Sequence, residues 1–227
     1  RFFFEIDGLL WSKDLRSNFE KVLSKIYFER FSKYGPKPEG SFWASKIRQN
    51  SRFKIIVDEV CKINKTGNIE LSDVGCGYGA LVDYLKFCNL SSRVQYSGYD
   101  ISEGLIKNCK IECSEDWVDF SVGTYPSQIR PFCVMSGTYN MSATTDIIQW
   151  ETYVLNSLMK CWQKTSKAMI FNLQIAKKTK ITKEMIFYAE RTRILDFCLS
   201  SFGPTKLVAR KDLPNDLTFV VLKPLLD

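Results

Sequence analysis

The sequence of 227 residues contains no histidine. Histidine is the side chain whose ordinary pKa lies closest to neutral pH, and it is the most frequent general base and a common zinc ligand. Its absence excludes mechanisms that depend on a histidine base. Proton removal near neutral pH therefore falls to an aspartate, a glutamate, a tyrosine or water.

Closely spaced cysteine pairs are also scarce, although the chain has eight cysteines. Cys109 and Cys113 have the spacing of half a zinc site, but no second pair follows them. The eight are spread over mostly apolar segments, at positions 61, 76, 88, 109, 113, 133, 161 and 198. Buried free thiols in a reducing compartment explain this distribution better than disulfides, and we expect no metal site.

No run of about 18 apolar residues is present, so we expect no membrane-spanning helix. The opening Arg1–Phe4 is followed at once by acidic residues, and a signal peptide is not expected either. These features favour a cytoplasmic protein that does not bind membranes. The net charge of +7 is modest and Lys177–Lys180 is a lone short basic cluster, so nucleic acid stays an open but disfavoured partner.

The composition, with 45% hydrophobic and 25% charged residues, is that of a globular domain. Apolar positions at helical spacing predict helices over residues 12–33 and 45–61, separated by a segment rich in proline and glycine. We interpret residues 1–63 as an N-terminal helical extension or lid and residues 64–227 as the core, within one structural domain overall.

From residue 69 onward, short apolar runs alternate with helical stretches, which indicates a parallel sheet and the α/β fold class. The predicted strands are residues 69–74, 94–101, 117–122, 132–139 and 168–175, and the predicted helices are residues 80–88, 102–113, 149–163 and 183–201. Two last strands, 206–211 and 217–222, are joined by a short link without a helix. Such a link permits only an antiparallel pair.

The most informative segment is residues 71–79, Leu-Ser-Asp-Val-Gly-Cys-Gly-Tyr-Gly, between the first core strand and its helix. Glycines at such a turn let bare backbone amides approach a ligand. The spacing differs from the G-x-G-x-x-G of dinucleotide sites, and Asp73 stands two residues before the first glycine. A second carboxylate, Asp100, ends the next strand, where it can accept hydrogen bonds from ribose hydroxyls.

These motifs and the terminal hairpin resemble those of class I S-adenosylmethionine-dependent methyltransferases. The resemblance implies a Rossmann-like three-layer sandwich with a seven-stranded, mostly parallel sheet and an antiparallel C-terminal strand. It also implies S-adenosylmethionine as cofactor and S-adenosylhomocysteine as product. The implied cofactor contacts are Asp73 with the ammonium group, the loop of Gly75, Cys76, Gly77 and Gly79, Asp100 with the ribose, and Ile101 with the adenine.

Further site residues follow from the same resemblance. Small Ser136 and Gly137 leave room for the sulfonium, and Tyr139 and Asn140 point into the pocket as candidate catalytic residues. Asn140 equally fits a helix cap. The family often has an acid near the adenine amine where this chain has Thr124, so that contact falls to Thr124 or to a backbone carbonyl.

The remaining predicted residues belong to the lid and to the acceptor pocket. Arg52 either pairs with the cofactor carboxylate or is a surface arginine. The segments around Tyr34 and Trp43 resemble the lid of some small-molecule methyltransferases. Trp150 and Tyr153 are candidates for the pocket wall.

The expected function is methyl transfer to a small molecule by in-line displacement, with positioning and little general-base catalysis. The acceptor is an anion such as a carboxylate, an amine, or a hydroxyl activated by Asp, Glu or Tyr, and the modest positive charge favours the anion. The alternatives are a nucleic-acid methyltransferase, a non-catalytic S-adenosylmethionine-binding module and, less favoured by the glycine spacing, an NAD-dependent oxidoreductase.

Overall fold

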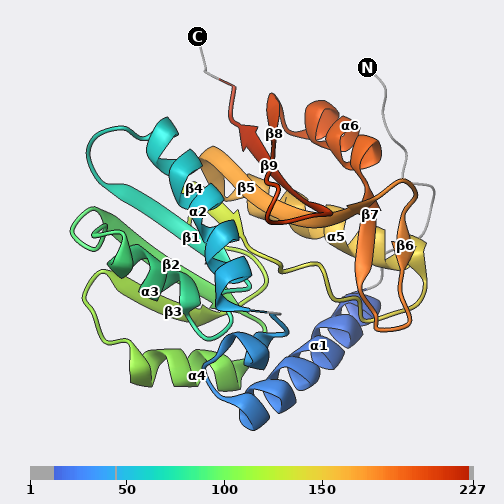
Figure 1. The fold of residues 1–227 in the computed structure, drawn as a ribbon, viewed down its shortest axis with the longest axis horizontal. Helices are drawn as coiled ribbons and strands as arrows, with labels where there is room; N and C mark the ends of the chain where they lie inside the picture. Colours follow the sequence, from blue (N-terminus) through green and yellow to red (C-terminus); the bar gives the residue numbers. More distant parts are fainter. Residues whose placement is uncertain (1–12, 44, 225–227) are drawn as a thin grey trace.

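A computed structural model describes residues 13–43 and 45–224. A twisted central sheet is covered by helices on both faces (Figure 1). The first strands are β1 (Ile69–Val74), β2 (Val94–Asp100), β3 (Val118–Val122), β4 (Arg130–Met135) and β5 (Thr165–Ala176). They are parallel and lie in the order β3-β2-β1-β4-β5, so the chain changes direction across the sheet between β1 and β4. Ligands of such folds bind at this switch point.

The C-terminal hairpin joins this sheet as the sequence predicts. Strand β9 (Asp216–Leu222) pairs antiparallel with β5, from Ala168 opposite Leu222 to Gln174 opposite Asp216. Strand β8 (Thr205–Ala209) pairs antiparallel with β9 at the edge. The order β3-β2-β1-β4-β5-β9-β8 therefore accounts for the seven expected strands, with β9 as the antiparallel one.

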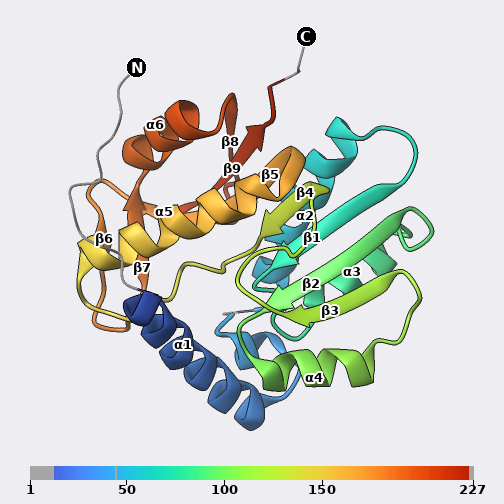
Figure 2. The same cartoon turned by 180° about the vertical axis from the view of Figure 1, so that it is seen from behind.

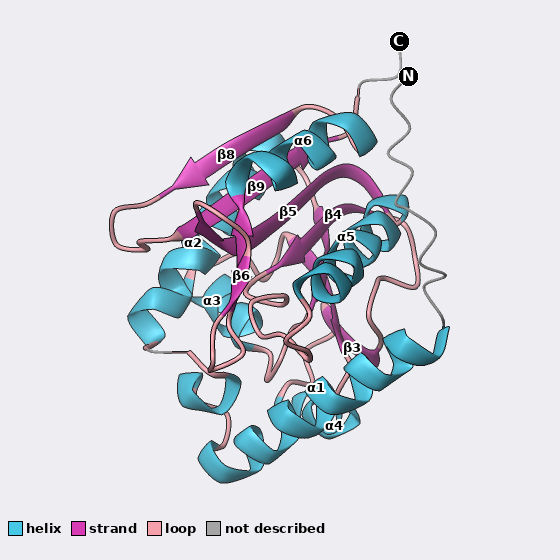
Figure 3. Ribbon diagram, turned by 90° about the vertical axis from the view of Figure 1, so that its right-hand side faces the viewer, coloured by secondary structure: helices cyan, strands magenta, loops and turns pink. Residues whose placement is uncertain are grey.

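Helices cover the two faces of the sheet in two groups. On one face lie α2 (Lys46–Ile63), α3 (Ala80–Phe87) and α4 (Glu103–Glu112), and on the other lie α1 (Lys13–Tyr34), α5 (Ile147–Gln163) and α6 (Arg191–Ser201). Figure 2 shows α5 running across the second face, and Figure 3 shows α1 beside α4. A short 3-10 helix, η1 (Pro38–Ser41), connects α1 to α2.

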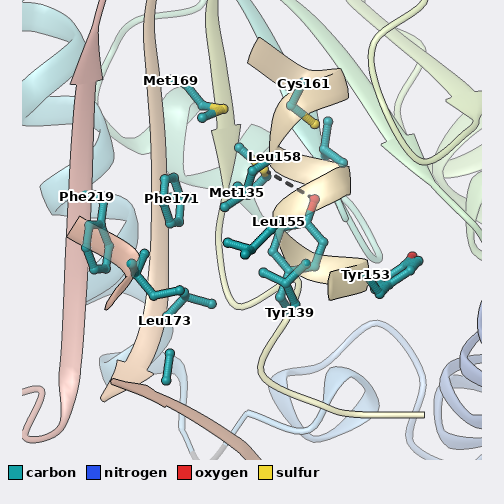
Figure 4. Packing of buried hydrophobic residues seen from close by; sticks show 14 of the residues in the cluster. Met135, Tyr139, Tyr153, Leu155, Leu158, Cys161, Met169, Phe171, Leu173 and Phe219 are labelled. Carbon is teal, nitrogen blue, oxygen red and sulfur yellow. Dashed lines mark hydrogen bonds between the residues drawn. The ribbon is translucent and has the colours of Figure 1, made fainter. Parts of the chain in front are cut away.

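The period-two alternation of β5 explains why both faces need helices. Ala168 and Ile170 pack against α2 and α3, whereas Met169, Phe171 and Leu173 pack against α5 (Figure 4). All five side chains have no exposed surface. Burial of both faces is typical of parallel strands with crossover helices.

The predicted helix over residues 183–201 is wrong in its first half. Residues 180–190 form two short strands, β6 (Lys180–Ile181) and β7 (Phe187–Glu190), and α6 begins only at Arg191. Phe187 and Ala189 are buried and alternate with partly exposed Tyr188 and Glu190, which is the period of a strand. β7 pairs with the far end of β5, so the sheet of the described residues has nine strands instead of seven.

None of the helices in the described part of the chain is long and apolar enough to span a bilayer.

Strand β7 predicts a contrast between two neighbouring aromatic residues. Phe187 is fully buried in the cluster beneath α5, so Phe187→Ala should lower the free energy of unfolding by roughly 3–5 kcal/mol. Tyr188 faces outward, with Lys180 over its ring, and Tyr188→Ala should cost less than about 1 kcal/mol. Urea unfolding of both variants measures the difference, and equal costs would contradict the alternation.

Candidate functional site

The turn between β1 and α3 has a backbone that only glycine adopts readily. Gly75, Gly77 and Gly79 have φ values of +76°, +58° and +84°. A Cβ at Gly75 would lie 2.6 Å from the Thr138 side chain, whose hydroxyl donates to the carbonyl of Val74. The glycines therefore serve both the turn and the close contact between the ends of β1 and β4.

The turn is tied to the end of β2. The amides of Gly75 and Cys76 both donate to the carbonyl of Tyr99, at 2.7 and 3.1 Å. The next amide in the loop, that of Gly77, donates to Oδ2 of Asp100 at 3.0 Å. Asp100 Oδ1 accepts from the amide of Ser102, the residue that caps α4. Four backbone amides thus fix the geometry of the loop and of the carboxylate.

Asp73 occupies the other side of the turn. Its side chain is buried, and the Tyr96 hydroxyl donates to Oδ2 at 2.7 Å. Burial, reinforced by the nearby Asp100, raises the pKa of Asp73 to about 7, although the hydrogen bond from Tyr96 opposes the shift. Burial also raises the pKa of Asp100, against the effect of its backbone donors. The site therefore holds two carboxylates whose charge is costly without a cation.

A cavity of about 100 Å³ opens between these carboxylates, under α1. The sequence-predicted residues that line it are Trp43, Asp73, Gly75, Cys76, Gly77, Asp100, Ile101, Thr124, Ser136, Gly137, Tyr139 and Tyr153. They come from the carboxyl ends of β1, β2, β3 and β4, from α5 and from the segment before α2. Gly79 does not line the cavity, but it caps the N-terminus of α3 in a left-handed conformation.

Further residues of the lining were not predicted from the sequence. Leu23 and Tyr27 of α1 close the cavity, and the ring of Tyr78 lies against it with its hydroxyl donating to Oε1 of Gln49 at 2.9 Å. Burial, with a smaller effect from Asp100, raises the pKa of Tyr27 above its usual value. The spacing of Leu23 and Tyr27 within the apolar face of α1 is a signal only for packing, so their contact with the site could not be foreseen.

The Tyr139 side chain, a predicted catalytic group, has its hydroxyl directed differently from the prediction. Its ring borders the cavity, but the hydroxyl points into the core and donates to Sδ of Met135 at 3.6 Å (Figure 4). Burial raises the pKa of Tyr139 well above its usual value. A protonated hydroxyl that faces methionine and α5 does not act as a base on a ligand in the cavity.

Asn140 lies at a second cavity and is not a helix cap. Its Oδ1 accepts from the amide of Gln174, and its carbonyl accepts from the amide of Phe187. The residue that caps α5 is Asp146, which accepts from the amide of Gln149. Asn140 therefore joins the end of β5 to the β6–β7 segment.

Arg52 is not a surface arginine, because its side chain is buried beside the site. It forms an ion pair with Asp216 and lies over the ring of Trp43, 4.5 Å from the centroid. Asp216 also accepts from the Asn172 side-chain amide at 2.9 Å, and Asn172 Oδ1 accepts from the amide of Gly137 at 2.8 Å. A buried polar network therefore runs from α2 to the loop after β4.

Two predicted pocket residues lie elsewhere. Trp150 is fully buried and stacks on Tyr153, with ring centroids 4.9 Å apart, so that Tyr153 separates it from the cavity. Tyr34 ends α1 at the surface, where Arg30 covers its ring. In the described residues, no group of three His, Cys, Asp or Glu side chains is placed to hold a metal ion.

The arrangement of the chain is similar to that of several solved methyltransferases. A SAM-dependent methyltransferase from Leishmania major has a TM-score of 0.65 at 13% identity, with 88% of this chain and 82% of that chain covered. Magnesium protoporphyrin IX methyltransferase from Synechocystis PCC 6803 with bound SAM has a TM-score of 0.64 at 12% identity, with 90% and 97% covered. The fold is that of the class I methyltransferases.

Other comparisons agree with this methyltransferase fold. A SAM-bound amino pentose methyltransferase from Micromonospora echinaspora has a TM-score of 0.58 at 9% identity, with 78% of this chain and 92% of that chain covered. In sequence, the chain is 22% identical over 138 residues to a Mycobacterium tuberculosis protein named "Putative methyltransferase Rv1506c". The aligned residues cover 60% of this chain and 82% of that protein. No family model matches the sequence.

The raised pKa of Asp73 predicts that this carboxylate lowers the stability of the ligand-free protein. An aspartate in an unfolded chain has a pKa of about 3.9, so ionisation at about 7 in the fold makes the cost grow between pH 4 and 7 and persist above 7. Asp73→Asn keeps an acceptor for Tyr96 and removes this charge. It should raise the free energy of unfolding by roughly 1–3 kcal/mol at pH 8 and by less at pH 5.

Urea unfolding at the two pH values measures the effect of Asp73→Asn. The matched control is Asp119→Asn in β3, whose side chain is exposed and should leave the stability unchanged at both values. A loss of stability for Asp73→Asn at pH 8 would contradict the proposed cost of the buried charge.

Proposed function

We propose that this chain is an S-adenosylmethionine-dependent methyltransferase that acts on a small molecule. The observation that carries the proposal is the pair of buried carboxylates, Asp73 and Asp100, on the two sides of the glycine turn at one cavity. Burial, with the added charge of Asp100, raises the pKa of Asp73, and burial with both carboxylates nearby raises that of Cys76. Such a cavity favours a ligand with positive charge, and S-adenosylmethionine carries both a sulfonium and an ammonium group.

The bonding of Asp100 fits a ribose with two free hydroxyls. An ionised carboxylate has about four lone-pair positions, and the amides of Gly77 and Ser102 occupy one on each oxygen. The amide of Ile101 also stabilises the charge, and the lone-pair positions that remain can accept from a hydroxyl donor. Ile101, which follows Asp100 on the cavity wall, offers an apolar surface to an adenine ring.

Thr124 fits the adenine end less simply than the sequence predicts. Its hydroxyl oxygen already accepts a hydrogen bond from Nη2 of Arg16, at 2.5 Å. The hydroxyl keeps one hydrogen, which suits a ring nitrogen of adenine, and one free lone pair. We assign the amine contact to a backbone carbonyl of the β3 loop, one of the two alternatives that the sequence left open, because Arg16 already holds the Thr124 oxygen.

When bound, S-adenosylmethionine supplies a methyl group that is open to direct attack by a nucleophile, because the positively charged sulfur that carries it is a good leaving group. The residues of this chain hold that group in place and exclude water. Ser136 and Gly137 are small residues on the wall after β4, and the ring of Tyr139 closes that wall. Alignment in a dry pocket supplies much of the rate of such a displacement.

The tyrosines of the cavity support positioning over base catalysis. Burial raises the pKa of Tyr27, Tyr139 and Tyr153, so all three are protonated near neutral pH. Asp73 and Asp100 are engaged by Tyr96 and by backbone amides. Little general-base catalysis is therefore proposed.

We further propose that residues 1–63 act as a lid on a core of residues 64–227, within one domain. Leu23 and Tyr27 of α1 and Trp43 before α2 all line the cavity, which supports this division for the described part of the lid. Residues 1–12 lie outside the described residues. A cavity closed in this way suits a small acceptor better than a nucleic acid, and two of the similar structures are named for small-molecule substrates.

The first test is calorimetric titration of the protein with S-adenosylmethionine and S-adenosylhomocysteine. Asp100→Asn keeps the shape of the side chain but removes the charge and one acceptor. It should weaken binding of both compounds roughly 10- to 100-fold, since charge-assisted hydrogen bonds contribute about 1.5–3 kcal/mol. Asp119→Asn is the matched control and should bind like the wild type.

If well-folded wild-type protein gives no measurable heat with either compound at millimolar concentrations, the proposal is wrong. Binding without chemistry would support a non-catalytic module instead. Conversion of S-adenosylmethionine to S-adenosylhomocysteine in the presence of a cell extract, lost in Asp100→Asn, separates the enzyme from such a module.

A further inference from the structure

A second cavity of about 140 Å³ adjoins the first one and has a different character. The two share a wall formed by Tyr27, Ser41, Trp43 and Gly137. Gly137 has a φ of +77°, and a Cβ there would lie 2.9 Å from Nη1 of Arg52. The backbone of one glycine therefore stands between the carboxylates of the first cavity and the arginine side of the second.

Charge distinguishes the second cavity from the first. Arg48 and Arg52, one turn apart on α2, line it, and no described Asp or Glu does. Arg52 is neutralised by its ion pair with Asp216. Arg48 lies at the exposed mouth, and none of the ion pairs among the described residues includes it. Arg48 also helps to lower the pKa of Asp216 against the effect of burial, so two arginines share one carboxylate and the cavity has a net positive charge.

The remaining wall is partly apolar and partly amide. Phe42, Met141 and Ile186 supply apolar surface, and the side chains of Asn140 and Gln174 supply hydrogen-bonding groups. Ile186 comes from the β6–β7 segment and forms an antiparallel bridge with Met141. The link between the two strands added to the expected sheet thus contributes a wall of this cavity.

We propose that the second cavity binds the methyl acceptor and that the acceptor is an apolar carboxylate whose charged group is held by Arg48. This inference rests on the proposed methyltransferase function. A carboxylate suits the site because guanidinium groups bind carboxylates through two parallel hydrogen bonds. An ammonium group would be repelled by Arg48, and a hydroxyl would need a base that the wall does not offer.

The transfer balances without a proton. A carboxylate oxygen forms a bond to the methyl carbon, the bond from that carbon to sulfur breaks, and the electron pair of the broken bond stays on sulfur. The products are a neutral methyl ester and a neutral thioether. No group must accept a proton, which agrees with a chain that has no histidine.

The test uses wild-type protein saturated with S-adenosylhomocysteine and three matched probes, 4-phenylbutyrate, 4-phenylbutylamine and 4-phenylbutanol. Straight-chain acids of four to ten carbons, with the corresponding amines and alcohols, extend the series. Calorimetry should detect carboxylate binding at about millimolar concentrations, as expected for ligands of this size, and at least tenfold weaker binding of each matched amine and alcohol. Methyl transfer from labelled S-adenosylmethionine should show the same order.

Arg48→Met keeps most of the side-chain length and removes the charge. It should weaken carboxylate binding and raise the KM for the acid about 5- to 20-fold, with kcat changed less than threefold and the affinity for S-adenosylmethionine within twofold. Arg48→Lys should recover at least half of the loss on a logarithmic scale. The control is Arg191→Met, at an exposed arginine at the start of α6, which should change none of these values.

Several results would overturn the assignment. They are binding of no carboxylate at 10 mM to protein that binds S-adenosylhomocysteine, equal binding of amines or alcohols, and an equal effect of Arg191→Met. A tenfold loss of S-adenosylmethionine affinity in Arg48→Met would assign Arg48 to the cofactor carboxylate instead. Failure of wild-type protein to bind the cofactor is a separate outcome, because it rejects the proposed function itself.

Discussion

The site depends on the hydrogen bonds that tie the glycine turn to the end of β2. Gly75 and Cys76 donate to the Tyr99 carbonyl, and Gly77 donates to the Asp100 carboxylate. These bonds hold a backbone with three positive φ angles and fix a buried carboxylate before any ligand arrives. Satisfying the amides internally is required because the turn is enclosed by α1 and by the loop after β4, where unpaired amides would be costly. The cavity is thus preorganised by main-chain contacts, with side chains added around it.

Much of the fold could be predicted because its signals are local. The turn after β1 is marked by three alternating glycines, and Asp73 and Asp100 stand at strand ends, where parallel topology brings side chains together. The C-terminal hairpin was likewise determined by the length of one link. Residues 183–190 were predicted as the first half of a helix, and they form a turn and β7 instead. Only the four residues of β7 show a burial pattern with a period of two. Pairing with the end of β5 stabilises them as a strand.

The parts of the site that sequence could not predict are those made by distant residues. The network from Arg52 through Asp216 and Asn172 to Gly137 joins α2, β9, β5 and the loop after β4. Arg52 and Gly137 were candidate site residues, but nothing in the sequence links them to Asn172 or Asp216. Only the fold shows that Arg52 is buried, and burial then requires the acidic partner. The direction of the Tyr139 hydroxyl has the same origin, because Met135 and α5 offer the ring a place in the core.

The absence of histidine and the electrostatics of the two cavities are consistent with one another. A site that buries its carboxylates and tyrosines raises their pKa values, which keeps the tyrosines protonated near neutral pH and leaves Asp73, held by the Tyr96 hydroxyl, as a carboxylate that titrates there. The same burial makes one side of Gly137 attractive to a cation, and Arg48 makes the other side attractive to an anion. A cationic ligand in the first cavity and an anionic ligand in the second would meet at Gly137, because glycine has no side chain to separate them. Under the proposed function, alignment by charge then takes over the task that a base performs in enzymes with neutral acceptors.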